Sequence, residues 1–284
     1  MQTKVLTHQV RGYTARTIYR HLPRLAALGV VERDECPEGP TRIVNTLVDG
    51  RGTELCDLVG RFASSSMTQL PNGQVDAAAW SSLGLLADLW EAGAVDELSR
   101  GSRSPTELAR GLDSLSYHQV NRRASRFSAS GFLCERDHAR TQRRCYALTD
   151  KTRRTMALVA GIGRWRHRHL ATGRVASSAG GEVEALLRAC LPLARIPQHA
   201  GRAMAVHIAF DGGVAEVWME VDAGGAVHAR EVPSTTIDGW AEADTEGWLT
   251  AIVDRKDVSA GGDRELVDDC LHSLYERLWT PSPF

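Results

Sequence analysis

ELARGLDSLSYHQVNRRASRFSASGFLCERD (residues 107–137) repeats, at an offset of about 102 residues, the pattern of VLTHQVRGYTARTIYRHLPRLAALGVVERD (residues 5–34). The residues that align are Leu6 with Leu108, Val10 with Leu112, Thr14 with Ser116, Ile18 with Val120, Leu25 with Phe127 and Gly29 with Gly131. The match continues through NTLVDGRGTEL (45–55) and YALTDKTRRTM (146–156). A repeat that spans about 50 residues is too long for a solenoid unit, so it predicts a duplicated domain.

Each copy predicts a short helix, a turn, a second helix and a two-stranded hairpin. In the second copy, residues 104–107 (Ser-Pro-Thr-Glu) supply an N-cap, a proline at the first helical position and a capping-box glutamate. Val120, Ala124 and Phe127 follow the i, i+4, i+7 spacing of the second helix, which Ser116 is placed to cap. A glycine ends that helix in each copy, and an apolar pair begins the first strand of the hairpin.

This order of elements is that of a winged helix-turn-helix. The pattern L-x3-L-x3-S, a helix, G-(F/V)-L-x-R, a wing and (Y/T)-x-L-T-D resembles the HxlR and MarR-like transcriptional regulators. The second copy is closer to HxlR, because LLADLWEAGAVDELSRGSRSPTELARGL precedes its helix-turn-helix and a helix ending in RWRHRHL follows its wing. The resemblance covers about residues 3–170 and implies two tandem domains that bind double-stranded DNA.

The first copy departs from that family because it begins at the second helix of the domain. Two explanations are open. Either the chain starts too late to include the first helix, or another segment, such as residues 80–93, takes its place. In both cases the DNA binding of the first copy is in question.

The charge of the chain is unevenly distributed. Residues 1–180 carry 26 basic and 17 acidic side chains, whereas residues 181–284 carry 8 and 18. Within residues 120–174 the numbers are 14 and 3. A basic half joined to an acidic half indicates that one end of the chain meets a polyanion.

We expect the second helix of each copy to enter a major groove and the second wing to contact phosphates or a minor groove. The predicted DNA-binding residues are Arg16, Thr17 and Arg20 in the first copy, Tyr117, His118, Gln119, Arg122 and Arg123 in the second, and Arg140, Arg143 and Arg144 in the second wing. Glutamine pairs with adenine and arginine with guanine. The first wing, ECPEGPTR, is acidic and a poorer candidate. The alternative is that the winged helices mediate only dimerisation.

The acidic half predicts a small sheet with helices. GRVASSAGG (173–181) has the composition of a linker, and EVEALLRACLPLA after it is helical in pattern. MAVHIAFDGG, VAEVWMEVDAGG and AVHAREV alternate with period two between Asp-Gly and Gly-Gly turns, and TIDGWAEA is a further candidate strand. Asp244 or Thr245 is placed to cap a helix over TEGWLTAIVD, and RELVDDCLHSLYERLW predicts a last helix.

Residues of about 182–280 resemble a sterol-carrier-protein-like domain, through AEADTEGWLTAIVDRKDVSAGGDRELVDDCLHSLYERLW. The resemblance implies an apolar cavity that holds a hydrophobic small molecule. The candidate lining residues are Trp218, Trp240, Trp248, Leu249, Ile252, Leu271, Tyr275 and Trp279. For each of them an ordinary place in the core is the alternative.

The chain carries no recognisable enzyme motif and no metal motif, and its six cysteines are scattered, so we expect no catalytic, cofactor or metal site. No apolar run is long enough for a membrane helix, and the N-terminus lacks a signal-peptide core, so we expect a cytoplasmic protein without a membrane partner.

Together these features predict an α+β chain in four parts. They are a first winged helix (1–70), a second winged helix (76–172), a linker (173–181) and a ligand-binding domain (182–284). The predicted function is a transcriptional regulator, by family analogy a repressor, whose DNA affinity a hydrophobic effector modulates. Whether chains also pair as homodimers is left open. The alternatives are a lipid or metabolite carrier, and an enzyme accessory protein in which the winged helices only hold chains together.

Overall fold

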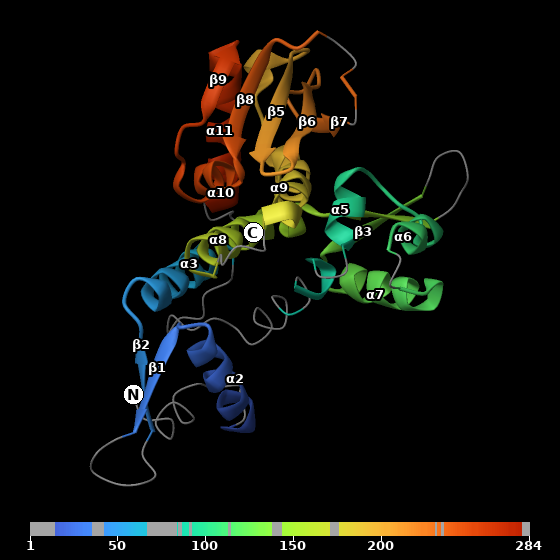
Figure 1. The fold of residues 1–284 in the computed structure, drawn as a ribbon. Helices are drawn as coiled ribbons and strands as arrows, with labels where there is room; N and C mark the ends of the chain where they lie inside the picture. The colour runs from blue at the N-terminus through green and yellow to red at the C-terminus, as the bar shows by residue number, and fades with distance from the viewer. Residues whose placement is uncertain are drawn as a thin grey trace. The chain divides into compact units, whose positions relative to one another are not determined.

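The computed structural model describes residues 15–35, 43–66, 84, 87–90, 93–112, 115–137, 144–170, 176–230, 232–233 and 236–279. It mixes helices with three antiparallel or mixed sheets, which confirms the predicted α+β class (Figure 1). The chain divides into two compact units, one of Met1–Arg61 with Trp165–Ala171 and one of Phe62–Arg164 with Thr172–Phe284.

The first unit holds α2 (Ala15–Ala27), a hairpin of β1 (Val31–Glu35) and β2 (Ile43–Leu47), and the first part of α3 (Arg51–Ser66). α2 ends as the sequence predicts, because Gly29 takes a left-handed φ of 66° that few other residues adopt at low cost. The Val30 amide then donates to the Leu25 carbonyl at 2.9 Å and turns the chain into β1.

The second unit repeats this segment at the predicted offset. α7 (Tyr117–Ala129) and β3 (Leu133–Asp137) have the same lengths as α2 and β1 and lie 102 residues later, and β4 (Arg144–Leu148) pairs with β3. The ends of the helices also match. Gly131 has a φ of 73°, and the Phe132 amide donates to the Phe127 carbonyl at 2.9 Å. The two copies therefore share one backbone design.

Two short helices precede α7. They are α5 (Ala94–Ser99) and α6 (Pro105–Gly111), and α6 begins with the predicted capping box. The Ser104 hydroxyl accepts from the Glu107 amide, and the Glu107 carboxylate accepts from the Ser104 amide at 2.7 Å. Just before α6, the backbones of Arg103 and Tyr146 exchange two hydrogen bonds, of 3.0 and 2.8 Å, so that a one-residue bridge extends the β3–β4 hairpin.

α8 (Asp150–Leu170) follows the second hairpin, and α9 (Ala176–Cys190) begins earlier than the sequence indicates. Residues 173–181 were expected to form a linker, but residues 176–181 are the first turns of α9. One contact accounts for a glycine in this part of the helix: a Cβ on Gly180 would lie 2.4 Å from the ring of Phe210.

The last part of the chain is a five-stranded sheet in the order β7-β6-β5-β8-β9. Its strands are β5 (Ala203–Phe210), β6 (Gly213–Val221), β7 (Val227–Arg230), β8 (Gly239–Asp244) and β9 (Ser259–Gly262). β5 and β8 are parallel, and the other neighbours are antiparallel. Short 3-10 turns, Leu191–Leu193 and Pro197–His199, lead into it. The predicted strands are confirmed, whereas β9 was not predicted.

α9, α10 (Thr245–Asp254) and α11 (Arg264–Trp279) pack against this sheet. The core side of the sheet carries Met204, Val206, Ile208, Val217 and Met219, all at most 1% exposed. Asp244 caps α10 as predicted, since its carboxylate accepts from the Gly247 amide at 2.7 Å. Within the described part of the chain, no helix is long and apolar enough to cross a bilayer.

Candidate nucleic-acid interface

The orientation of α7 is determined by its ends and by its apolar side. Val120, Ala124 and Phe127 are each 3% exposed, and they face the core formed with α6 and β3. Ser116 caps the helix, because its hydroxyl accepts from the Gln119 amide at 3.4 Å. With one side buried and the first turn capped, the opposite side of α7 points to solvent.

That outer side is polar and basic. The predicted residues on it are exposed: Tyr117 at 48%, with His118, Gln119, Arg122 and Arg123. Arg126, which the sequence analysis missed, is exposed one turn beyond Arg122. Among the described residues, no carboxylate forms an ion pair with any of the three arginines of α7. Their charges are therefore available to an anionic partner.

Gln119 has a second role that the sequence analysis did not assign. Its side-chain oxygen accepts the backbone amide of Ser116 at 2.8 Å, which completes a capping box at the start of α7. A glutamine that pairs with adenine uses both its oxygen and its amino group. Gln119 would therefore have to leave the cap in order to make that contact.

The second wing is described only at its base. Arg144 begins β4, with its side chain 60% exposed, and it lies 3.1 Å from the carboxylate of Glu135 on β3. The other two predicted wing arginines, Arg140 and Arg143, lie outside the described residues. Glu135 therefore partly offsets the charge of Arg144.

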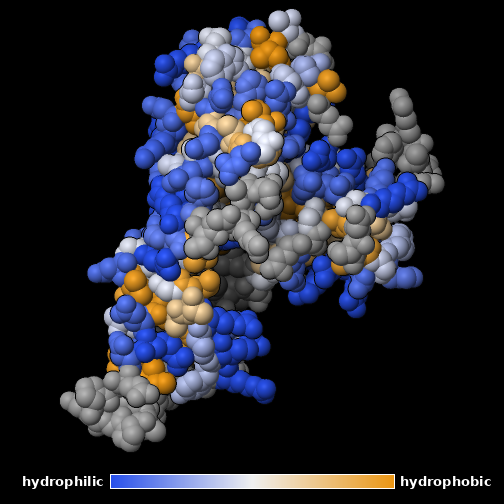
Figure 2. Space-filling view, viewed as in Figure 1, coloured by the Kyte–Doolittle hydropathy of each residue, from blue (hydrophilic) through white to orange (hydrophobic). Residues whose placement is uncertain are grey.

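α2 presents a similar face in the first unit. Arg16 and Arg20 are exposed and Thr17 is half-buried, while Leu22 on the other side is 7% exposed. Arg24, which was not among the predicted DNA-binding residues, is also exposed, one turn beyond Arg20. Figure 2 shows hydrophilic side chains gathered over this helix. The spacing i, i+4, i+8 places Arg16, Arg20 and Arg24 along one side of α2.

The histidine-rich end of α8 has a structural role in the first unit. The Trp165 indole donates to the Arg51 carbonyl at 2.7 Å, and the Arg51 guanidinium donates to the His169 carbonyl at 2.6 Å. His169 Nε2 lies 2.8 Å from a Glu54 carboxylate oxygen, and Arg168 lies 3.3 Å from the other oxygen. These contacts hold the start of α3 against the end of α8.

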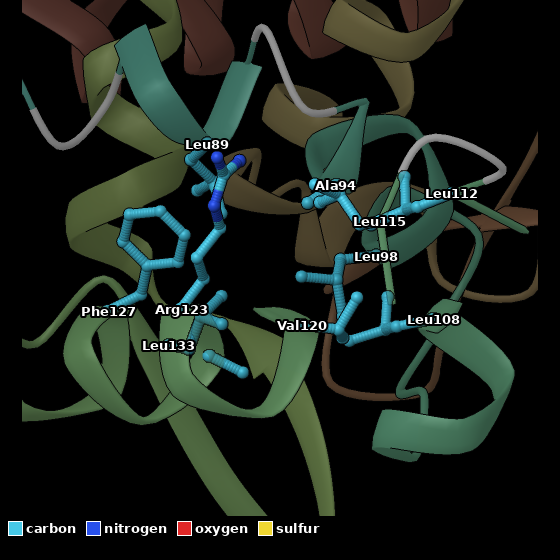
Figure 3. A pocket seen from close by; sticks show the side chains of 11 residues that line it. Leu89, Ala94, Leu98, Leu108, Leu112, Leu115, Val120, Arg123, Phe127 and Leu133 are labelled. Carbon is cyan, nitrogen blue, oxygen red and sulfur yellow. The ribbon is translucent and has the colours of Figure 1, made fainter. Parts of the chain in front are cut away.

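A small apolar cavity lies between α5, α6 and α7 (Figure 3). Its volume is about 20 Å³, which is room for roughly one water molecule. Its wall includes Leu98, Leu108, Phe127 and the stem of Arg123. A metabolite does not fit this space, so it is a packing defect of the helical core.

The same cavity decides one question about the first copy. Residues 80–93 were considered as a replacement for its missing first helix. Leu89 is fully buried, however, and lines the cavity beside Leu98 and Phe127 in the second copy. Leu89 therefore belongs to the core of the second copy.

The eight residues predicted to line a ligand cavity do not surround one space. Trp218 and Trp240 both pair with Ala205, so the three side chains form a row across β6, β5 and β8. This row lies on the side of the sheet opposite Met204 and Val206, because side chains alternate along a strand. Trp240 covers Gly261 of β9 and stacks on His207, with ring centroids 6.3 Å apart.

The other candidates belong to the helical layer. Trp248 is fully buried and donates its indole N–H to the His207 carbonyl at 2.8 Å, and Trp279 donates to the Ile252 carbonyl at 2.9 Å. Leu249 and Ile252 are buried on α10, and Leu271 and Tyr275 are half-buried on α11. Trp248 is thus a core tryptophan with a satisfied indole N–H, and Trp279 is half-buried.

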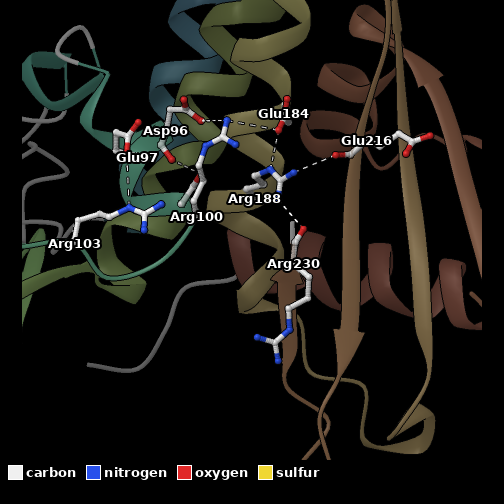
Figure 4. A network of polar contacts seen from close by, with 9 residues as sticks. Asp96, Glu97, Arg100, Arg103, Glu184, Arg188, Glu216 and Arg230 are labelled. Carbon is white, nitrogen blue, oxygen red and sulfur yellow. Dashed lines mark hydrogen bonds and ion pairs between the residues drawn. The ribbon is translucent and has the colours of Figure 1, made fainter. Parts of the chain in front are cut away.

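α9 is joined by polar contacts to the sheet and to α5 (Figure 4). Arg188 is 4% exposed and donates to the Glu184 carboxylate at 2.8 Å, to the Arg230 carbonyl at 2.9 Å and to the Glu216 carbonyl at 3.1 Å. Glu184 in turn lies 3.8 Å from Arg100, just after α5. A buried guanidinium thus connects the edge of the sheet with the helix that packs on α5.

Two cysteines of this unit are buried and inert. Burial raises the pKa of Cys190 to about 12 and that of Cys270 to about 12, far from the range in which a thiolate forms.

On α11, hydrogen bonds from Gln198 and His199 lower the pKa of Asp269. Within the described residues, no group of three metal-binding side chains comes together.

No protein-family model matches this chain, and no curated protein sequence matches it significantly.

Proposed function

We propose that the chain is a DNA-binding transcriptional regulator in which α5, α6, α7 and the β3–β4 hairpin form an HxlR-like winged helix-turn-helix. The observation that carries the proposal is the outer side of α7. Arg122, Arg123 and Arg126 are exposed there without a carboxylate partner among the described residues, on a helix whose start is capped. A recognition helix needs such a polar, basic side, held outward by an apolar one.

The surroundings of α7 support the same function. α6 precedes it across a short turn. A winged helix has a short third strand that pairs with its hairpin, and the one-residue bridge between Arg103 and Tyr146 of β4 occupies that position. The net positive charge of residues 120–174 gives the region the electrostatic character of a phosphate-binding surface. In this proposal α2 and the β1–β2 hairpin are a second, partial winged helix.

We further propose that the C-terminal sheet and helices sense a hydrophobic effector and reduce DNA affinity when it binds. The contacts of α9 supply a physical connection, because α9 packs on both the sheet and α5. Such regulation requires the effector to bind one arrangement of the chain better than another. Quenching of tryptophan fluorescence by an apolar ligand, accompanied by release of DNA, is the expected result.

The test of DNA binding compares two double variants. Arg122→Ala with Arg126→Ala removes two charges from α7, and Arg264→Ala with Arg277→Ala removes two exposed charges from α11. Fluorescence anisotropy with a labelled duplex from upstream of the gene measures affinity. We expect the α7 variant to weaken binding to every duplex and the α11 variant to bind like the natural chain. Equal affinities of the two variants would contradict the proposal.

The same experiment addresses the alternative in which the winged helices only hold chains together. That function predicts feeble binding by the natural chain and no effect of either double variant. Analytical ultracentrifugation of the α7 variant then separates the two: loss of DNA binding with an unchanged sedimentation coefficient supports contact with DNA.

A further inference from the structure

The two exposed helix faces can be compared position by position, because α2 and α7 have the same length and lie 102 residues apart. Two arginine positions are the same in both copies. They are Arg20 with Arg122 and Arg24 with Arg126, and all four side chains are exposed. The apolar positions also match in residue character, Ile18 with Val120 and Leu25 with Phe127, but Ile18 and Leu25 are half-buried where Val120 and Phe127 are buried. The packing side and part of the cationic side are therefore common to both helices.

Other outward positions differ. One pair is Thr17 with Gln119. Three more are Arg16 with His118, Tyr19 with Asn121 and His21 with Arg123, and five of these last six side chains are exposed, Asn121 being half-buried. Arginine and histidine offer different donors to a base edge, and tyrosine and asparagine differ in size and in hydrogen-bonding groups. Base-reading positions determine sequence preference, whereas contacts to phosphates carry no sequence information.

Resting on the proposed function, we infer that the chain binds one asymmetric DNA site whose two halves differ in sequence. α7 contacts one half and α2 the other, through shared arginines on phosphates and different side chains on bases. A homodimer with one recognition helix per chain presents identical side chains to both half-sites, and its site is palindromic as a result. This chain carries two helices with unlike outer sides, so one copy of the chain has no such symmetry.

The arginines that the two helices share provide the first part of the test. Arg24→Ala and Arg126→Ala are matched variants at equivalent, exposed positions in the two copies. If both helices contact phosphates, each variant makes the negative slope of log affinity against log salt shallower by about 0.9. An effect of Arg126→Ala alone would overturn the inference, because α2 would then not touch DNA, while the proposed function of α7 would stand.

The second part of the test selects DNA from a pool of random duplexes with the full-length chain. We expect the enriched sequence to have two unlike halves. Arg16→His, Tyr19→Asn and His21→Arg together give α2 three of the outer side chains of α7, and we expect this variant to change one half of the selected site toward the other. An unchanged circular dichroism spectrum and thermal midpoint check that the variant folds.

Three outcomes decide the matter. Two unlike halves, one of which changes with the substituted α2, support the inference. A palindromic site, or a site that the substituted α2 leaves unchanged, overturns it without affecting the function of α7. The absence of any enriched sequence with the natural chain overturns both the proposed function and the inference drawn from it.

Discussion

Replacing Arg188 by methionine should destabilise the unit that contains the sheet. The guanidinium is 4% exposed and makes three hydrogen bonds, to the carboxylate of Glu184 and to the carbonyls of Glu216 and Arg230. Methionine has a similar volume but no hydrogen-bond donor, so the Glu184 carboxylate and the carbonyls of Glu216 and Arg230 each lose the hydrogen bond that Arg188 donates. Breaking a buried ion pair by removing one partner costs about 3–5 kcal/mol, and Arg100 at 3.8 Å from Glu184 offsets part of that cost.

Urea unfolding followed by tryptophan fluorescence measures this change, because Trp248 and Trp279 lie in the same unit. A loss of about 3–5 kcal/mol corresponds to a midpoint lower by about 1–2 M urea. Arg264→Met is the control, since this side chain is 68% exposed and its pair with Asp268 spans 3.6 Å on the surface; such pairs contribute less than about 0.5 kcal/mol. Equal midpoints for the two variants would refute the structural role assigned to Arg188.

Three further results are expected. Ser116→Ala should lower the thermal midpoint and weaken DNA binding little, because it removes a cap of about 1 kcal/mol but leaves Gln119 able to reach a base; a large loss of sequence preference would contradict this. Iodoacetamide at pH 8 should leave Cys190 and Cys270 unmodified in peptide mass spectra of the native chain, because burial raises the pKa of each to about 12. Labelling of either at the rate of a free thiol would contradict the burial of these two side chains. The pKa of Asp269 is lowered in the folded state, so its stabilising contribution is present above the unfolded pKa and is lost as the pH falls through the folded pKa. Asp269→Asn should therefore make the free energy of unfolding fall less steeply as the pH is lowered. An unchanged fall at acid pH would mean that the carboxylate is not held by Gln198 and His199 as described.

The duplicated segment could be predicted from sequence because each of its features is local. The apolar residues of α2 and α7 follow helical spacing, and a glycine with positive φ ends each helix. The capping box at Ser116 also carried a visible signal, since Ser116 and Gln119 fit the S-x-x-Q pattern. The competition between this cap and base recognition is visible only in the structure, where the side-chain oxygen of Gln119 accepts a hydrogen bond from the Ser116 amide.

Other features depend on tertiary contacts. β9 has the sequence SAGG, which lacks the branched and aromatic residues of strands; it is a strand because its backbone pairs with β8, and Gly261 leaves room for the Trp240 ring. Composition likewise suggested a linker where α9 begins. The separation of Trp218 from Trp248 could have been foreseen, because the alternation in β6 places Trp218 with Glu216 and not with the buried Val217.

The salt dependence of DNA binding by the natural chain tests the central claim most directly. α2 and α7 together expose six arginines, namely Arg16, Arg20, Arg24, Arg122, Arg123 and Arg126. If the four that the two helices share, Arg20, Arg24, Arg122 and Arg126, neutralise phosphates, log affinity falls against log salt with a slope of about −4, and binding is tighter to duplex from upstream of the gene than to a scrambled duplex. A slope near zero, with equal and feeble binding to both duplexes, would contradict the account.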